Sequence, residues 1–349
     1  METKGNKLFI GGVSAEDLVR EFGSPLYAYD EELIKKRYDE LEKGITWPKK
    51  RIYYACKANT NPEIMKLLLD KGAYIDAVSP GEVAVALKSG FSHKKILFTG
   101  NNATDDDMQY CIDNNILVNA GSLSQIERYG KLNPGAEVSI RINPDVGAGH
   151  HSHCITGGPE SKFGIYHDRA DEIKKAADKH GLKIEGIHAH IGSGILDTGT
   201  FLKAMEMVLR TAKQFEGLEF IDFGGGIGVP YRPEEEPIDT ARLGKEMSDR
   251  FSSFCREYGK ELVMAIEPGR YIVAESGCLL ATANNRKETP NHIFVGTDSG
   301  FNHLVRPAMY GSYHHIINAS NTGGKKEKVV VAGNICESGD VFTQSEQGV

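Results

Sequence analysis

The stretch YYACKAN at residues 53–59 decides the fold, because it has the composition of a buried strand that ends on Lys57 at a strand-to-helix corner. Residues 51–56 are rich in aromatic and apolar side chains, and Pro62 suits the first turn of a helix that we expect over 63–70. An ammonium at this corner is expected to be partly desolvated, which lowers its pKa and favours the neutral amine that forms Schiff bases with carbonyls. A lysine that extends to solvent is the alternative.

From residue 51 onward one pattern recurs: a short apolar run, a polar corner and an amphipathic helix. We count eight such runs, at 51–56, 73–78, 95–98, 117–119, 137–142, 184–190, 218–223 and 261–266. Helical patterns lie between them, for example at 80–88, 104–114, 168–180, 201–215 and 240–258. Strands that alternate with helices indicate parallel pairing with right-handed crossovers, and eight repeats predict a closed (β/α)8 barrel of the α/β class. A doubly wound open sheet is the alternative.

After Glu267-Pro268-Gly269-Arg270 the helical period disappears and extended patterns take over. These patterns lie at 271–273, 278–283, 292–295, 315–317 and 328–331. They predict a second, C-terminal all-β domain, which we expect the short N-terminal extended pieces to join. The predicted domains are therefore a barrel at 31–270 and a β domain made of 1–30 plus 271–349.

Composition narrows the class of partner. Hydrophobic residues at 40% and charged residues at 26% are ordinary for a globular protein, and the net charge of -7 provides no basic face for nucleic acid. A small-molecule partner is the better prediction. The six cysteines are scattered without a CxxC pair, which favours reduced thiols and a cytoplasmic location. We find no signal peptide and no apolar run of membrane-spanning length, and so expect no membrane partner.

Polar residues collect where the predicted strands end, and the carboxyl ends of the strands are where (β/α) barrels carry their chemistry. These residues are Lys57, Ser79, Arg141, Asn143, His190, Ser193, Gly224, Gly225, Gly226, Glu267 and Arg270. A structural barrel has no need for such a set, so their shared position predicts an active site.

Two of these strand ends indicate a specific chemistry. The glycines at 224–226 could present successive backbone N–H groups to a phosphate, with a tight turn as the alternative. His188 and His190 lie two apart in one predicted strand and would share a face, with His190 nearer the mouth. A neutral imidazole there could stack on an aromatic ring.

Two further clusters stay open to more than one interpretation. A metal site is conceivable at His150, His151, His153 and Cys154. These residues have no second ligand pair at a matching spacing, so we predict a polar loop over the barrel mouth and no metal. The segment Cys336-Glu337-Ser338-Gly339-Asp340 could supply an acid and an ammonium-binding carboxylate, or it could be an ordinary turn.

Six blocks of the sequence, in order, resemble the diaminopimelate decarboxylase family. The blocks are Tyr54-Ala55-Cys56-Lys57-Ala58-Asn59, His188-Ala189-His190-Ile191-Gly192-Ser193, Gly224-Gly225-Gly226, Glu267-Pro268-Gly269-Arg270, Arg306-Pro307-Ala308-Met309-Tyr310-Gly311 and Cys336-Glu337-Ser338-Gly339-Asp340. The resemblance implies pyridoxal 5'-phosphate as cofactor and an alanine racemase-like barrel with a β domain. It also implies a homodimer whose active sites are shared between the subunits.

The resemblance assigns roles around the cofactor. Lys57 would hold it covalently, the glycines at 224–226 would hold its phosphate, and His190 would stack on the ring. Glu267 would pair with the pyridine nitrogen and keep it protonated, so that the ring acts as an electron sink. The set that we predict to bind the cofactor is Lys57, Asp76, Ser79, His190, Ser193, Gly224, Gly225, Gly226 and Glu267.

The resemblance also assigns the substrate contacts. Arg270, Arg306 and Tyr310 would grip the carboxylate at the distal end of the substrate, a task that suits guanidinium groups. Glu337 would hold the distal ammonium, and Cys336, from the partner subunit, would protonate the carbanion. Together these roles imply that CO2 leaves the D-centre of meso-2,6-diaminopimelate and that L-lysine is the product, in the last step of lysine biosynthesis.

The sequence departs from the family pattern in two places. Residues 147–151 replace a Thr-His pattern, and family members continue past the block at Cys336 with more strands and a tyrosine that contacts the cofactor. We therefore expect a truncated β domain here. The alternatives are a sister decarboxylase of another D- or L-amino acid, a racemase, and a non-catalytic cofactor-binding relative or fragment. Glu337 disfavours ornithine-type enzymes, which have an aspartate at that position.

Overall fold

The computed structural model describes residues 1–146, 148–149, 157–343 and 347–348, and the chain packs into two compact units. The barrel unit consists of 35–229 and 237–274. The β unit consists of 1–34, 230–236 and 275–349. The division into domains at 31–270 and at 1–30 plus 271–349 stays a prediction.

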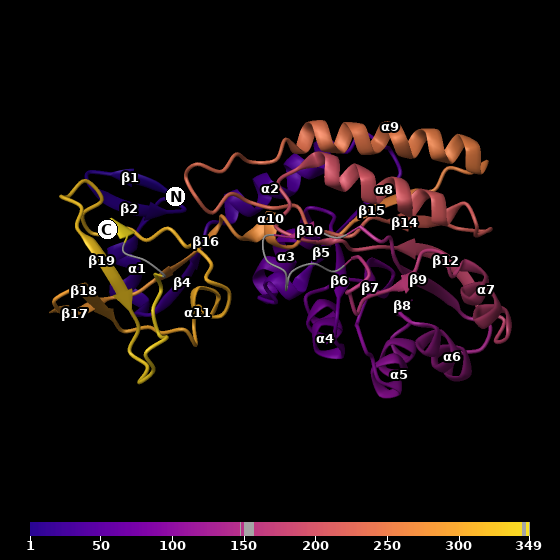
Figure 1. Cartoon of the computed structure of the whole chain (residues 1–349), viewed down its shortest axis with the longest axis horizontal. Helices are drawn as coiled ribbons and strands as arrows, with labels where there is room; N and C mark the ends of the chain where they lie inside the picture. The colour runs from indigo at the N-terminus through magenta and orange to yellow at the C-terminus, as the bar shows by residue number, and fades with distance from the viewer. Residues whose placement is uncertain (147, 150–156, 344–346, 349) are drawn as a thin grey trace. The chain divides into compact units, whose positions relative to one another are not determined.

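Eight parallel strands close the barrel in the order β5-β6-β7-β8-β9-β12-β14-β15, and β15 pairs back with β5 (Figure 1). Their bounds are Lys50–Ala55, Tyr74–Ala77, Ile96–Phe98, Leu117–Ala120, Glu137–Asn143, Lys183–His188, Phe220–Asp222 and Val263–Ile266. A short strand β11, Ile165–Tyr166, adds to β9. Each of the eight predicted runs overlaps one barrel strand, so the (β/α)8 prediction is confirmed and the open sheet is wrong.

Several helices, α3 and α4 among them, begin at side-chain caps that lie close to the strand ends. Asn61 accepts the N–H of Glu63 at the start of α3, and Ser79 accepts the N–H of Glu82 at the start of α4. Helices α4 to α7 lie outside the strands (Figure 1). Helix α2, Glu31–Gly44, begins in the β unit and continues into the barrel unit from residue 35. The other helices of the barrel unit are α3 Pro62–Asp70, α4 Pro80–Lys88, α5 Asp105–Asp113, α6 Leu123–Leu132, α7 Ala170–Asp178, α8 Thr198–Ala212, α9 Thr240–Tyr258 and α10 Arg270–Val273.

The predicted extended run at 271–273 is wrong, because these residues belong to helix α10. Their aromatic and β-branched side chains favour a strand by propensity, but all three are buried in the helix. Burial against the neighbouring structure outweighs an intrinsic β preference that spans only about 1 kcal/mol.

The amino end of the barrel is closed by packing. The Arg51 guanidinium lies 5.4 Å from the ring centre of Tyr74 and 5.9 Å from that of Phe220. All three residues lie at the amino-terminal ends of their strands. A Cβ on Gly186 would lie 2.1 Å from the buried ring of Phe220, so only glycine fits there. The chemistry is therefore left to the carboxyl end.

The β unit contains a four-stranded sheet in the order β17-β18-β19-β20, in which β18 and β19 are parallel. Strand β4 pairs antiparallel with β16, which joins the N-terminal segment to residues 277–280. The predicted extended run at 315–317 is wrong, since these residues form no strand. The elements of the unit are β1 Glu2–Lys4, β2 Lys7–Ile10, β3 Val13–Ser14, α1 Ala15–Phe22, β4 Leu26–Tyr29, β16 Gly277–Leu280, β17 Ala283–Glu288, β18 Ile293–Thr297, α11 Arg306–Tyr310, β19 Lys328–Ala332 and β20 Gln347–Gly348.

None of the helices in the described part of the chain combines the length and the apolar composition that a membrane crossing requires.

Candidate active site

Lys57 lies just beyond the end of its strand. Strand β5 ends at Ala55, and a single 3-10 turn, Cys56–Ala58, carries the lysine, so the prediction that Lys57 ends the strand is wrong by two residues. Its Nζ donates to Asp76 Oδ2 over 2.7 Å. The Lys57 side chain keeps 43% of its surface exposed while that of Asp76 keeps none, so a ligand can reach the amine but not the carboxylate beneath it.

The ionisation of Lys57 differs from the prediction. Desolvation lowers the pKa of its ammonium, but the carboxylates of Asp76 and Glu267 raise it by more, and the pKa ends above its usual value. In the chain without cofactor, Lys57 is therefore an ammonium. The neutral amine expected from the strand-to-helix corner is wrong, because the corner also contains a buried counter-ion.

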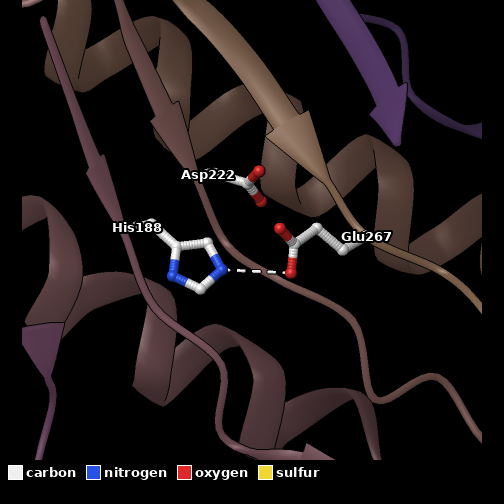
Figure 2. Close-up of side chains that lie close together, drawn as sticks. All are labelled: His188, Asp222 and Glu267. Carbon is white, nitrogen blue, oxygen red and sulfur yellow. Dashed lines mark hydrogen bonds and ion pairs between the residues drawn. The ribbon is translucent and has the colours of Figure 1, made fainter. Parts of the chain in front are cut away.

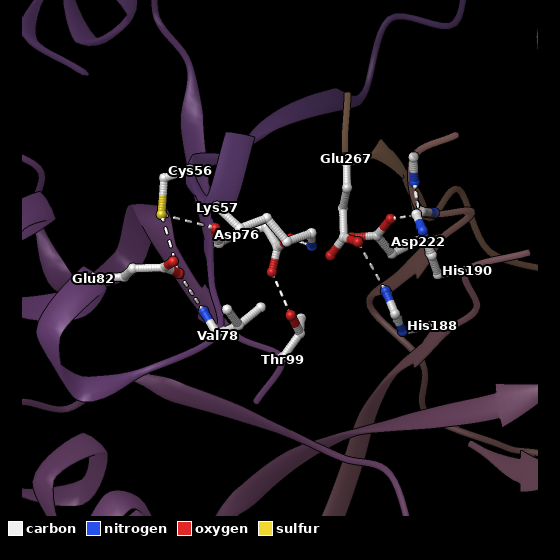
Figure 3. A network of polar contacts seen from close by, with 12 residues as sticks. Cys56, Lys57, Asp76, Val78, Glu82, Thr99, His188, His190, Asp222 and Glu267 are labelled. Carbon is white, nitrogen blue, oxygen red and sulfur yellow. Dashed lines mark hydrogen bonds and ion pairs between the residues drawn. The ribbon is translucent and has the colours of Figure 1, made fainter. Parts of the chain in front are cut away.

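Three further side chains surround the Lys57–Asp76 pair (Figure 3). Thr99 Oγ1 donates to Asp76 Oδ1, which occupies the second carboxylate oxygen. The Cys56 thiol donates to the backbone oxygen of Asp76 over 3.2 Å and to Glu82 over 3.4 Å. Burial and the nearby carboxylate of Glu82 raise the pKa of this thiol, so Cys56 packs as a neutral group and does not act as a nucleophile.

A second cluster comes from the ends of three other strands: His188 on β12, Asp222 on β14 and Glu267 just after β15 (Figure 2). His188 Nε2 lies 3.0 Å from Glu267 Oε2, and Asp222 Oδ1 accepts the N–H of Gly224 over 2.8 Å. Among the described residues, Glu267 Oε1 and Asp222 Oδ2 have no hydrogen-bond partner. Both carboxyl groups are buried, and buried polar atoms are normally hydrogen-bonded, so each of these two oxygens could form a hydrogen bond with a ligand.

The two carboxyl groups of this cluster hold different charges. Burial raises the pKa of Asp222 well above its usual value, and the neighbouring charge of Glu267 raises it further. Burial also raises the pKa of Glu267, but the contact with His188 and the charge of Lys57 lower it by more. Asp222 is therefore a neutral acid and Glu267 a carboxylate, which is how two acids share one buried site.

The same three side chains are the one group within the described residues whose ligand atoms, all within 4.8 Å of one another, could also hold a metal ion. The histidine and cysteine cluster considered in the sequence, His150 to Cys154, lies outside the described residues.

His190 occupies a different position from the one expected. Strand β12 ends at His188, two residues before His190, so the prediction that both histidines lie in one strand is wrong. His190 Nδ1 accepts the N–H of Gly225 over 3.0 Å. Burial and the positive charge of Lys57 lower the pKa of His190 well below its usual value, which keeps the imidazole neutral as expected.

The glycine turn after β14 is required by close approach of three segments. A Cβ on Gly225 would lie 2.2 Å from the backbone oxygen of Glu267, and one on Gly226 would lie 2.7 Å from that of Gly192. Gly226 also has a φ of 111°, which side chains rarely adopt. The N–H groups of Gly224 and Gly225 donate to Asp222 and His190, so the protein's own acceptors hold this part of the turn.

Arg141 is a site residue to which the sequence assigned no role. It lies at the end of β9, buried, with its guanidinium 4.5 Å from the ring centre of Phe163. Burial lowers its pKa, and the charges of Glu267 and Asp76 partly offset this. Its position at a strand end was the available signal.

The two predicted serines have local roles. Ser79 caps helix α4 through its hydroxyl, and Ser193 lies in the short strand β13, Gly192–Ser193, which pairs with β10, Ala148–Gly149. Whether either serine contacts a cofactor stays a prediction.

The predicted substrate contacts fall into both units. Arg270 begins helix α10 in the barrel unit, whereas Arg306 and Tyr310 form the two ends of α11 in the β unit. The Arg306 guanidinium lies 4.7 Å from the ring centre of Tyr231 and 3.2 Å from Nε2 of His314, two neighbours that the sequence did not suggest. Cys336 and Glu337 are exposed in the loop after β19, also in the β unit.

A closed (β/α)8 barrel with a lysine, a neutral imidazole and a buried carboxylate at its strand ends has the architecture of a cofactor-dependent barrel enzyme. Residues 31–274 match the family model described as pyridoxal-dependent decarboxylase, pyridoxal binding domain. The chain belongs to this family of pyridoxal-dependent decarboxylases.

The similar proteins include several diaminopimelate decarboxylases, which confirms the resemblance. The one from Methanothermobacter thermautotrophicus is 46% identical over 97% of this chain and 82% of its own length. The one from Escherichia coli K12 is 36% identical over 96% of this chain and 82% of its own. A crystal structure of the Methanocaldococcus jannaschii enzyme matches with a TM-score of 0.89 at 34% identity, covering 100% of this chain and 84% of that one. The Helicobacter pylori enzyme complexed with L-lysine matches with a TM-score of 0.85 at 33% identity, covering 96% and 85%.

The residues of the barrel unit fit pyridoxal phosphate. The buried, ionised Glu267 has an oxygen without a partner among the described residues, which suits a protonated pyridine nitrogen. Lys57 is accessible in the same polar network, as an aldehyde-binding amine must be (Figure 3).

Asp76→Asn should shift cofactor uptake to lower pH. The Asp76 charge raises the pKa of Lys57, so its removal leaves desolvation, which lowers that pKa, in control. Because the neutral amine is the reactive form, the pH profile for covalent uptake of pyridoxal phosphate should move down by about one unit or more. The rate at which visible absorbance develops in the cofactor-free protein measures this, with the surface variant Asp39→Asn as control. A profile that stays in place or moves up would contradict the assigned role of Asp76.

Proposed function

We propose that this protein is a decarboxylase that uses pyridoxal phosphate to release CO2 from meso-2,6-diaminopimelate and forms L-lysine, the last step of lysine biosynthesis. The observation that carries the proposal is the buried, ionised Glu267 beside the Lys57 network, in a chain 46% identical to a diaminopimelate decarboxylase. The bound cofactor supplies a protonated pyridine ring that accepts the electron pair left when CO2 departs.

Lys57 and Glu267 would carry the main work at the cofactor. Lys57 would hold the cofactor covalently and exchange it for the amine of the substrate, and the anionic Glu267 would keep the pyridine nitrogen protonated. His190, neutral at physiological pH, would cover the ring face without adding a competing positive charge. The cofactor phosphate would lie at the turn Gly224, Gly225 and Gly226, of which the first two N–H groups already donate to Asp222 and His190. Asp76, Ser79 and Ser193 would complete the set.

The substrate contacts would come from five side chains. Arg270, Arg306 and Tyr310 would bind the distal carboxylate, and the ring of Tyr231 beneath Arg306 supports this by restricting the guanidinium. Glu337 would bind the distal ammonium. Cys336 would return a proton to the carbon that lost CO2, and its exposure supports a role against a partner's site.

We further propose a homodimer with shared active sites, acting in the cytoplasm. Five cysteines in the described part of the chain are free thiols, which supports a reducing compartment. Sedimentation of the purified protein, with and without pyridoxal phosphate, measures the oligomeric state.

The test of function is a product assay on the purified protein loaded with pyridoxal phosphate. We expect stoichiometric CO2 and L-lysine from meso-diaminopimelate, and far slower release from L-lysine or ornithine. Turnover of ornithine alone would assign a sister decarboxylase. A cofactor-bound chain that releases no CO2 from any of the three would assign a non-catalytic relative.

A further inference from the structure

Asp340 is a buried carboxylate beside an exposed loop. Residues 336–339 are exposed, whereas Asp340, the next residue, is only 3% exposed. The side chain therefore points into the β unit, and the loop that precedes it faces solvent. Burial of a carboxylate destabilises the fold unless hydrogen bonds compensate the lost hydration. The hydrogen-bond partners of Asp340 therefore indicate its role.

The carboxylate of Asp340 connects two separate segments. Its Oδ1 accepts the N–H of Phe301 over 2.6 Å, and its Oδ2 accepts the N–H of Ile335 over 2.8 Å. A backbone bond of 2.8 Å from Asn334 to Ser299 joins the same two segments. Each carboxylate oxygen thus accepts one backbone N–H from a different segment, so the side chain of Asp340 ties the two segments together.

The shape of the site admits little besides this carboxylate. A Cβ on Gly300 would lie 2.8 Å from Asp340 Oδ2, and a Cβ on Gly333 would lie 2.1 Å from the same atom. Both segments are glycine at the point where they meet Asp340, so the backbone of each closes directly on the carboxylate. A longer acid would not fit without displacing one of them.

The two joined segments are the ones that carry proposed substrate contacts. Strands β18 and β19 are parallel neighbours, so the loops that follow them leave the sheet at the same edge. The loop after β18 leads through Phe301 to Arg306 and Tyr310, and the loop after β19 contains Cys336 and Glu337.

We propose that Asp340 is a positioning residue that fixes the Arg306 segment and the Cys336 loop relative to each other. The inference rests on the proposed function, because it is that function which makes both segments contact substrate. With Asp340 in place, one buried group sets both the carboxylate-binding arginine and the thiol that would serve the partner's site. Without it, each loop can move independently, and misplacement of a reacting group by about 1 Å can cost on the order of 10²-fold in rate.

Asp340→Asn tests this with little change in size. The amide has one acceptor oxygen in place of two, so either Phe301 or Ile335 loses its partner. We expect kcat/KM for meso-diaminopimelate to fall about ten- to a hundredfold, with most of the loss in kcat. Titration with pyridoxal phosphate should match the wild type, because Lys57 lies in the barrel unit.

Asp30→Asn is the control. Asp30 also lies in the β unit and accepts a backbone N–H, that of Leu33, over 3.2 Å, and both residues lie outside the two loops. A purely structural role for Asp340 predicts that the two variants lose activity in proportion to their loss of thermal stability. The proposal is overturned if the two variants have equal activities when their thermal stabilities are equal, or if Asp340→Asn retains the kcat/KM of the wild type.

Amide hydrogen exchange provides a measurement that does not depend on catalysis. In the wild type, the N–H groups of Phe301 and Ile335 should exchange far more slowly than those of the exposed residues 336–339. If they exchange as fast as residues 336–339, Asp340 does not hold the two segments together, and this clamp is refuted even if Asp340→Asn fails to fold. If the wild type releases no CO2 from meso-diaminopimelate, the proposed function fails while slow exchange still supports the clamp. The two failures are thereby distinguished.

Discussion

Lys57→Ala should abolish the visible absorbance of bound pyridoxal phosphate and lower kcat by on the order of 10³-fold or more. The reason is positional. Lys57 is the amine that Asp76 holds at 2.7 Å in the network that also contains Glu267. A spectroscopic titration of the cofactor-free variant, followed by the CO2 assay, measures both effects.

The surface lysine Lys66 provides the control. It lies on α3 and pairs with Glu63, away from the strand ends, so Lys66→Ala should titrate and turn over like the wild type. If Lys57→Ala still develops the absorbance of covalently bound cofactor, another amine holds it and the assignment fails.

Glu267→Gln should lower kcat by on the order of 10² to 10³-fold, the range typical of the loss of one preorganised electrostatic contact in a dry site. The pKa of Glu267 lies below its usual range, because His188 and Lys57 outweigh its burial, so the group is an anion throughout neutral pH. The amide removes that charge and leaves a pyridine nitrogen without its counter-ion. Steady-state kinetics and the pH dependence of the bound-cofactor spectrum measure the change.

Asp222→Asn provides the matched comparison, because the same exchange of acid for amide is made on a neighbouring group with the opposite charge state. Burial keeps the pKa of Asp222 well above its usual value, so it is already neutral, and asparagine can keep the bond from Gly224. We expect a loss below about tenfold. If Asp222→Asn were the more damaging change, the anion would be at Asp222 and the two assignments would have to be exchanged.

Local signals explain why the barrel could be predicted. Each strand is an apolar run bounded by a polar corner. The predicted helices at 80–88 and 240–258 match α4 and α9, whose starts are capped by Ser79 and Asp239, and Gly259 ends α9 in the left-handed conformation. These signals lie within a few residues of the element that they define. Where local preference and burial disagree, as in α10, the pattern pointed to the wrong element.

The candidate site was predicted in part for the same reason. Lys57, His190 and Glu267 follow recognisable runs, and their motifs carry the family resemblance. Arg141 was recognised as a strand-end residue but was assigned no role, and Thr99 was not singled out. The contact of Thr99 with Asp76 becomes apparent only when strands β6 and β7 pair, and that of Arg141 with Phe163 only when the segment after β9 folds back over the strand.

Residue types and their order along the chain were enough to establish the eight repeats and the family, and to predict the members of the cofactor set. The protonation of those members depended on folding. Asp76 is 19 residues from Lys57 in sequence and Glu267 is 79 from His188, yet each pair is within 3.0 Å. A pKa responds to charges within several ångströms and to burial, whatever the separation along the chain. Only the closed barrel therefore decided that Lys57 is charged, that Glu267 is the anion and that Asp222 keeps its proton.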